Sequence, residues 1–182
     1  MECRNIRHGN GKLDGARRSG IIMGIRRRSR EFAMQALFYM DVNKNDSHEM
    51  VELFCDNFVH SKKAIPFFLK LVNGVIDNRS EIDSIIERFS SNWKLGRMSC
   101  VDRNIIRLAV YELLFCNDIP PKVSMNEAID IGKNFSADES GAFINGILDS
   151  IRIALEKEEI NIEVHSSRLE SNEELNREPL KR

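Results

Sequence analysis

The sequence predicts an all-α protein of about seven helices, arranged in two helical subdomains with flexible N- and C-terminal tails. Apolar residues recur at intervals of three and four in seven segments between about residues 26 and 155. No segment shows a convincing alternation of apolar and polar residues, so we expect no strand. With 182 residues and 42% hydrophobic residues, the chain has room for one compact domain plus tails.

Four helices are expected in the first half of the chain. The first covers about 26–42, and the second begins at a capping box formed by Asp46 and Glu49. The third begins near Pro66, a residue favoured in the first turn, and the fourth covers about 80–90. Their apolar stripes, in chain order, are Phe32, Ala33, Ala36, Leu37 and Met40; Met50, Phe54 and Phe58; Phe68, Leu71, Val72, Val75 and Ile76; and Ile82, Ile85, Ile86 and Phe89.

Three helices are expected in the second half, after the segment SSNWKLGRM (90–98) interrupts the pattern and divides the two subdomains. The first covers about 101–116. The second begins at a capping box of Ser124 and Glu127, and the third covers about 138–155. Gly146 lies inside the last helix, where it is expected to permit close helix–helix approach.

Charge is distributed unevenly along the chain. Residues 1–30 contain nine Lys or Arg and two acidic residues, a net charge of +7, whereas the remainder carries −8. Residues 1–23 have no apolar period and are expected to form a disordered basic extension. Residues 24–155 are expected to form the helical domain, and 156–182 a charged, disordered tail with few apolar anchors. A basic arm on an acidic body favours two surfaces, one for an anion such as nucleic acid and one for a basic protein.

Several functional classes find no support in the sequence. No apolar run approaches the length needed to span a bilayer. The four cysteines and four histidines show no metal-ligand spacing, so neither a zinc site nor a disulfide framework is expected. The carboxylates form no convergent set, and the three serines nearest helix starts (Ser99, Ser124 and Ser140) have no histidine nearby in sequence that could act as a base. We therefore expect neither catalysis nor a cofactor.

The stretch GIRRRSREFAMQALFYM (24–40) combines two features that conflict locally. Arg26, Arg27, Arg28 and Arg30 lead directly into an apolar helical stripe. If they stand at a helix N-terminus, the helix dipole penalises them. A phosphate group would reverse that penalty, because arginine gives planar, bidentate donors and a helix start offers free N–H groups. The pattern favours binding to RNA.

Two longer stretches carry a resemblance to a known family. VDRNIIRLAVYELLF (101–115) and PKVSMNEAIDIGKNFSADESGAFINGILD (121–149) resemble the NusB family of bacterial transcription antitermination factors, and RRRSREFAMQALF (26–38) is similar to its arginine-rich start. The resemblance covers about residues 25–155. It implies a cytoplasmic, seven-helix protein without cofactor that binds single-stranded boxA RNA in ribosomal RNA leader transcripts. It also implies ribosomal protein S10 (NusE), other Nus factors and RNA polymerase as partners.

The resemblance also implies roles for individual residues. Arg26, Arg27, Arg28 and Arg30 match the family's arginine motif, and Lys133 and Phe143 match positions near its RNA surface. Asp102 and Glu139 match acidic positions associated with the ribosomal-protein interface. Three positions depart from the family pattern, which weakens the match on that part of the RNA surface: Ala142 where a Lys is common, Gly141 beside it, and Gly132 in place of Ala.

Two alternatives remain open from the sequence. A related domain occurs at the N-terminus of ribosomal RNA cytosine methyltransferases, so the chain could be a fragment of such an enzyme. The basic arm could also bind an anionic membrane, although it lacks the Trp, Phe or Leu face of interfacial helices.

Overall fold

The computed structural model describes residues 14–90 and 93–160, with the backbone alone for 14–23. These residues form seven α-helices, one short 3-10 helix and no strand, which confirms the predicted fold class. The helices are α1 (Asp14–Asn43), α2 (His48–Phe58), α3 (Ile65–Asp77), α4 (Arg79–Phe89), η1 (Leu95–Arg97), α5 (Cys100–Phe115), α6 (Pro121–Phe135) and α7 (Ser140–Glu156).

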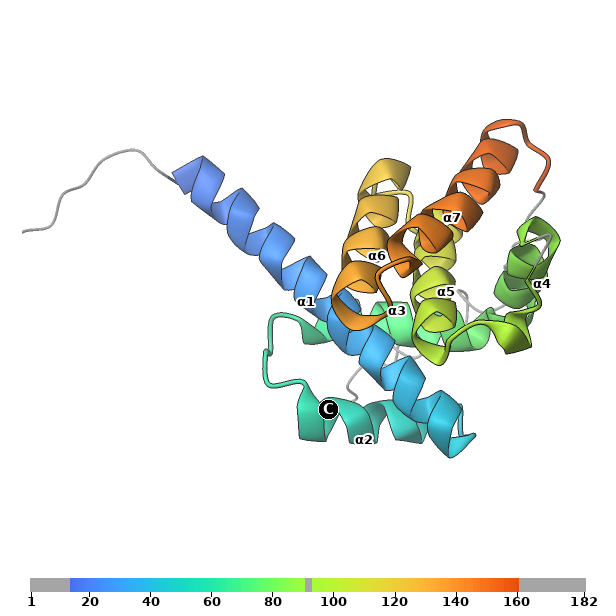
Figure 1. Ribbon diagram of the computed structural model, residues 1–182. Helices are drawn as coiled ribbons and strands as arrows, with labels where there is room; N and C mark the ends of the chain where they lie inside the picture. Colours follow the sequence, from blue (N-terminus) through green and yellow to red (C-terminus); the bar gives the residue numbers. More distant parts are fainter. Residues whose placement is uncertain (1–13, 91–92, 161–182) are drawn as a thin grey trace, which may run out of the picture.

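The helices are arranged around α5. Helix α1 packs on α3 and α5, α2 packs on α1 and α3, and α6 and α7 pack on each other and on α5 (Figure 1). Helix α4 contacts α5 and α7. The two groups of helices, before and after η1, share one continuous core that includes Phe68, Leu71, Ile106 and Leu148. Two side chains of α1, Arg27 and Arg30, also reach carboxylates of α6.

Helix α1 begins earlier than its expected start near residue 26. It begins at Asp14, and its first turns extend beyond the other helices (Figure 1). Residues 14–23 show no apolar period, but extending an existing helix is far easier than nucleating one, so a packed segment can continue into them. Arg26 to Arg30 therefore lie inside the helix, and the dipole penalty expected at a helix start does not apply to them. Residues 1–13 and 161–182 of the predicted tails lie outside the described residues.

Both capping-box predictions are wrong in detail. Ser47, not Asp46, caps α2, and its hydroxyl accepts a hydrogen bond from the Met50 amide. Asp46 instead pairs with Arg79. Helix α6 begins at Pro121 with Pro120 as its N-cap, because the two prolines fix the backbone one turn before Ser124. Ser124 is consequently buried within the helix, where its hydroxyl donates to Glu112 at 2.7 Å.

The glycines also differ from expectation. Gly146 has open space where a Cβ would stand, so it does not mediate helix packing. Gly132 does: a Cβ there would lie 2.5 Å from the Ile144 side chain. The absence of a side chain at Gly132 thus permits the close contact between α6 and α7.

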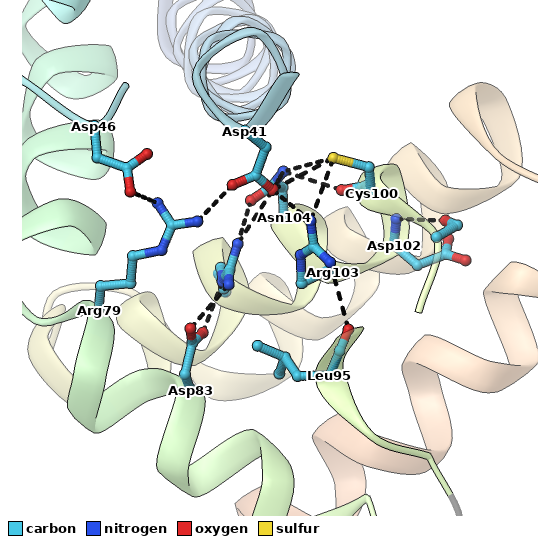
Figure 2. A network of polar contacts seen from close by, with 11 residues as sticks. Asp41, Asp46, Arg79, Asp83, Leu95, Cys100, Asp102, Arg103 and Asn104 are labelled. Carbon is cyan, nitrogen blue, oxygen red and sulfur yellow. Dashed lines mark hydrogen bonds and ion pairs between the residues drawn. The ribbon is translucent and has the colours of Figure 1, made fainter. Parts of the chain in front are cut away.

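A buried polar network fixes the C-terminal end of α1 (Figure 2). The Asp41 carboxylate accepts hydrogen bonds from Arg103 at 2.8 Å and Asn104 at 2.9 Å, and it also pairs with Arg79 and Arg107. Burial acts to raise the pKa of Asp41, but these hydrogen bonds and the nearby positive charge outweigh it and hold the pKa well below its usual range. The network ties α1 to α4 and α5 and so sets the direction in which α1 presents its arginines.

No helix in the described part of the chain is long and apolar enough to cross a bilayer.

Candidate nucleic-acid interface

Arg30 differs from the other three arginines of the motif because it lies inside the fold. Its side chain is 5% exposed, and its Nε and Nη2 atoms donate to the two Glu112 carboxylate oxygens at 2.7 and 2.9 Å. Glu127 lies 3.6 Å from its Nη1. A guanidinium held in this way joins α1 to α5 and α6 and has no free face for RNA. The structure therefore places Arg30 in the scaffold, against the role implied by the resemblance.

Arg26 lies half-exposed above the loop between α5 and α6. Its Nη2 donates to the Asp118 carboxylate at 3.0 Å, and Lys70 Nζ lies 3.6 Å from the same group. The Arg26 guanidinium also sits over the Phe67 ring, 5.2 Å from its centroid. Burial acts to raise the pKa of Asp118, but the hydrogen bond from Arg26 and the charges of Lys70 and Arg26 outweigh it and lower the pKa.

Arg27 and Arg28 complete the exposed part of the motif. Arg27 Nη1 donates to Asp130 of α6 at 3.3 Å, and its Nε lies 3.6 Å from Glu31. Arg28 is exposed, and its guanidinium lies over the Phe32 ring at 5.7 Å. Three arginines on successive residues thus point outward in different directions around α1, two of them held by carboxylates of the body.

One exposed basic residue of α6, Lys133, lies next to the start of α7. Asp130, which binds Arg27, is followed one turn later on α6 by the exposed Lys133. The Lys133 side chain lies over Gly141, where a Cβ would stand 3.2 Å from its Cγ and Cε. Gly141 therefore allows Lys133 to lie flat across the N-terminal end of α7, two residues from Phe143.

A hollow of about 210 Å³ opens beside Phe143, where the start of α7 meets the segment before α5. Trp93 and Phe143 form its aromatic wall, with ring centroids 5.6 Å apart at 69°. Trp93 is 52% exposed, an unusual position for the one tryptophan of the chain. The polar groups of the hollow come from Arg97, Ser99, Asp102, Glu139 and Ser140.

Asp102 contributes a buried carboxylate oxygen to the lining of this hollow. It lies in the first turn of α5, and its amide donates to the Ser99 side chain at 3.0 Å (Figure 2). The residue is 8% exposed, and its Oδ1 atom is buried without a hydrogen-bond partner. A buried polar atom normally has one, so this oxygen is an exception among the described residues.

The predicted residues therefore fall into three groups. Arg26, Arg27 and Arg28 lie on α1, and Lys133 lies between them and the hollow. Asp102, Glu139 and Phe143 meet at the hollow itself, although they come from two expected surfaces.

Sequence reasoning missed Trp93, Asp118 and Asp130. A lone tryptophan in a segment without helical period was a usable signal for the first, whereas nothing local marks the other two.

Comparison with known proteins decides the family. Residues 27–152 match the model of the NusB family. The chain belongs to that family. The transcription antitermination protein NusB of Desulfatibacillum aliphaticivorans is 58% identical over 137 residues, covering 75% of this chain and 96% of that protein. The NusB protein of Myxococcus xanthus is 47% identical, covering 74% of this chain and 99% of its own length.

Solved structures of NusB proteins share the fold. NusB of T. maritima is 41% identical, with a TM-score of 0.65 over 74% of this chain and 97% of that chain. A structure described as antitermination factors NusB and NusE in complex with dsRNA contains a chain that is 29% identical, with a TM-score of 0.66 over 72% of this chain and 98% of that chain.

Proposed function

We propose that this NusB-family chain is a transcription antitermination factor that binds the single-stranded boxA element of ribosomal RNA leader transcripts together with ribosomal protein S10 (NusE). In this role the pair acts with other Nus factors on elongating RNA polymerase and prevents premature termination. The observation that carries the proposal is the continuity of one surface from the exposed arginines of α1, through Lys133, to the hollow at Trp93 and Phe143.

The two ends of this surface suit different parts of an RNA strand. Arg26, Arg27 and Arg28 supply charge for successive phosphates, which fixes position without reading sequence. The hollow suits a base that has left its stack, because Trp93 and Phe143 offer aromatic faces and the lining residues Asp102 and Glu139 carry carboxylates, which accept hydrogen bonds from a base N–H. Only an unpaired base can enter such a site, which favours a single strand over a duplex.

The partner protein is proposed to bind close to the same place. Residues 31–182 carry a net charge of −8, which suits a basic ribosomal protein. Asp102 and Glu139 belong to the hollow, so we place the RNA and the protein partner on adjoining surfaces that meet there. Adjoining sites explain how one ligand would raise the affinity for the other, since the bound RNA would offer additional contacts to the partner protein and the partner protein to the RNA.

The methyltransferase alternative is less favoured. The relatives that this chain matches over 96% and 99% of their lengths are antitermination proteins. The proposed function involves no catalysis and no cofactor, and it places the protein in the cytoplasm with the transcription machinery.

The decisive experiment is a titration of labelled boxA-type RNA with the full chain, with and without S10. We expect binding of the single strand, weaker binding of the same strand annealed to its complement, and tighter binding when S10 is present. Equal affinity for both RNA forms, with no effect of S10, would overturn the proposal. Binding to anionic vesicles with no preference for RNA would favour the membrane alternative.

A further inference from the structure

Two carboxylates from outside α1 form ion pairs with arginines that the proposed RNA would contact. Asp118 holds Arg26 at 3.0 Å from the loop between α5 and α6, and Asp130 holds Arg27 at 3.3 Å from α6. Neither pair is needed to build the fold, because all four side chains are between 35% and 52% exposed. A separate, buried ion pair between Arg30 and Glu112 joins α1 to α5.

We propose that Asp118 and Asp130 are built-in competitors of RNA phosphate, which hold Arg26 and Arg27 in the free protein and are displaced when the strand binds. This inference rests on the proposed function of the arginine surface and adds a mechanism that sets its affinity. A phosphate oxygen and a carboxylate oxygen seek the same guanidinium N–H groups, so the two bonds exclude each other at one donor edge.

The exchange of carboxylate for phosphate changes the free energy little, because the arginine–carboxylate pairs and the arginine–phosphate contacts that replace them are both exposed to solvent. An exposed ion pair contributes little stability, so RNA displaces it at small cost. The carboxylates nevertheless place negative charge beside the arriving phosphates, which lowers the affinity for any polyanion. Arg28 has no carboxylate partner within the described residues and stays available for first contact.

The two pairs differ in a way that the experiment can use. Within the described residues, Asp130 forms an ion pair with Arg27 alone, whereas Asp118 is shared between Arg26 and Lys70. Removing Asp130 should therefore act mainly through Arg27. Removing Asp118 frees two cations at once and should have the larger effect.

The test compares RNA affinity for Asp118→Asn, Asp130→Asn and the matched control Asp149→Asn. Asp149 pairs with Arg152 on α7 and is 45% exposed, so its substitution removes the same charge away from the arginine surface. We expect about twofold to fivefold tighter binding for each of the first two variants, an effect typical of exposed charge pairs. We expect little change for the control. Equal gains in all three variants would reduce the effect to net charge and overturn the inference.

A double-mutant cycle then tests the pairing itself. In an Arg27→Ala background, Asp130→Asn should raise RNA affinity much less than it does in the wild type, because the group that it competes for is gone and only the removal of a nearby negative charge remains. A full gain in that background would overturn the inference. NMR titration gives a second readout, in which RNA should raise the pKa of the Asp118 carboxyl as Arg26 leaves it.

These outcomes separate the inference from the function on which it rests. If the wild-type chain binds boxA-type RNA and neither Asn variant binds more tightly, the competition is refuted and the proposed function stands. If neither the wild type nor the Asp118→Asn/Asp130→Asn double variant binds RNA, the proposed function itself fails.

Discussion

The Arg30 guanidinium and the Glu112 carboxylate form two hydrogen bonds of 2.7 and 2.9 Å in the interior, between α1 and α5. Ser124 of α6 donates to the same carboxylate at 2.7 Å, so one buried ion pair joins three helices. Neighbouring residues of one arginine-rich motif therefore have different tasks: Arg30 fixes α1 against the body, while Arg26, Arg27 and Arg28 remain on the surface.

Arg30→Ala should destabilise the protein by about 3–5 kcal/mol, because it leaves the Glu112 charge buried without its partner. Arg28→Ala is the matched control, since that side chain is exposed and should change stability by less than about 0.5 kcal/mol. Urea unfolding of both variants measures the difference. If Arg30→Ala kept full stability but lost RNA binding, the RNA-contact role implied by the family resemblance would be restored.

The salt dependence of RNA binding should reflect three arginines rather than four. At about −0.7 per phosphate on a single strand, three contacts give a slope of log K against log salt near −2. Arg27→Ala should flatten this slope by about 0.7, since one contact is lost. Lys44→Gln is a suitable control, because it removes a positive charge 18 residues beyond Arg26, about 27 Å along the helix direction. An unchanged slope for Arg27→Ala would exclude a phosphate contact at that residue.

Asp41→Asn should cost about 3–5 kcal/mol at neutral pH, because Arg103 and Arg107 would lose the carboxylate that offsets their buried charge. The pKa of Asp41 is lower in the folded protein than in the unfolded chain. Its contribution is therefore complete above the unfolded value of about 3.9 and is lost as pH falls below it toward the folded value.

The variant should consequently lose less stability than the wild type when unfolding is measured at decreasing pH below about 5. Asp149→Asn, at an exposed pair, should follow the wild-type profile. If the stabilities of Asp41→Asn and of the wild type fell in parallel as pH decreased, the titration of Asp41 would not be the cause of the loss of stability in acid.

The fold was predictable because it depends on local pattern. Stripes such as Phe68, Leu71, Val72 and Val75 identify a helix and its buried face together, and all four residues are fully buried. Helix starts were less predictable, since the true caps, Ser47 and Pro120, compete with equally plausible neighbours. The extension of α1 to Asp14 has no periodic signal at all.

The site was only partly predictable, because its members meet through tertiary contacts. Lys133 and Phe143 could be named from the family pattern, but periodicity does not distinguish them from ordinary surface and core residues. The partners Asp118 and Asp130 lie 92 and 103 residues from the arginines that they bind. The burial of Arg30 likewise follows from Glu112, 82 residues away, which no local rule connects to it.

Trp93 provides a direct test of the hollow, because it is the only tryptophan in the chain and is 52% exposed. If an unpaired base enters beside it, selective tryptophan excitation should show a fluorescence change that saturates with RNA. Trp93→Ala should weaken RNA binding by about 1–3 kcal/mol, the range for loss of one stacked base. Phe58→Ala is the matched control, since Phe58 is 51% exposed on α2 and does not line the hollow. Unaltered fluorescence at saturating RNA, together with wild-type affinity for Trp93→Ala, would restrict the RNA to the arginine surface of α1.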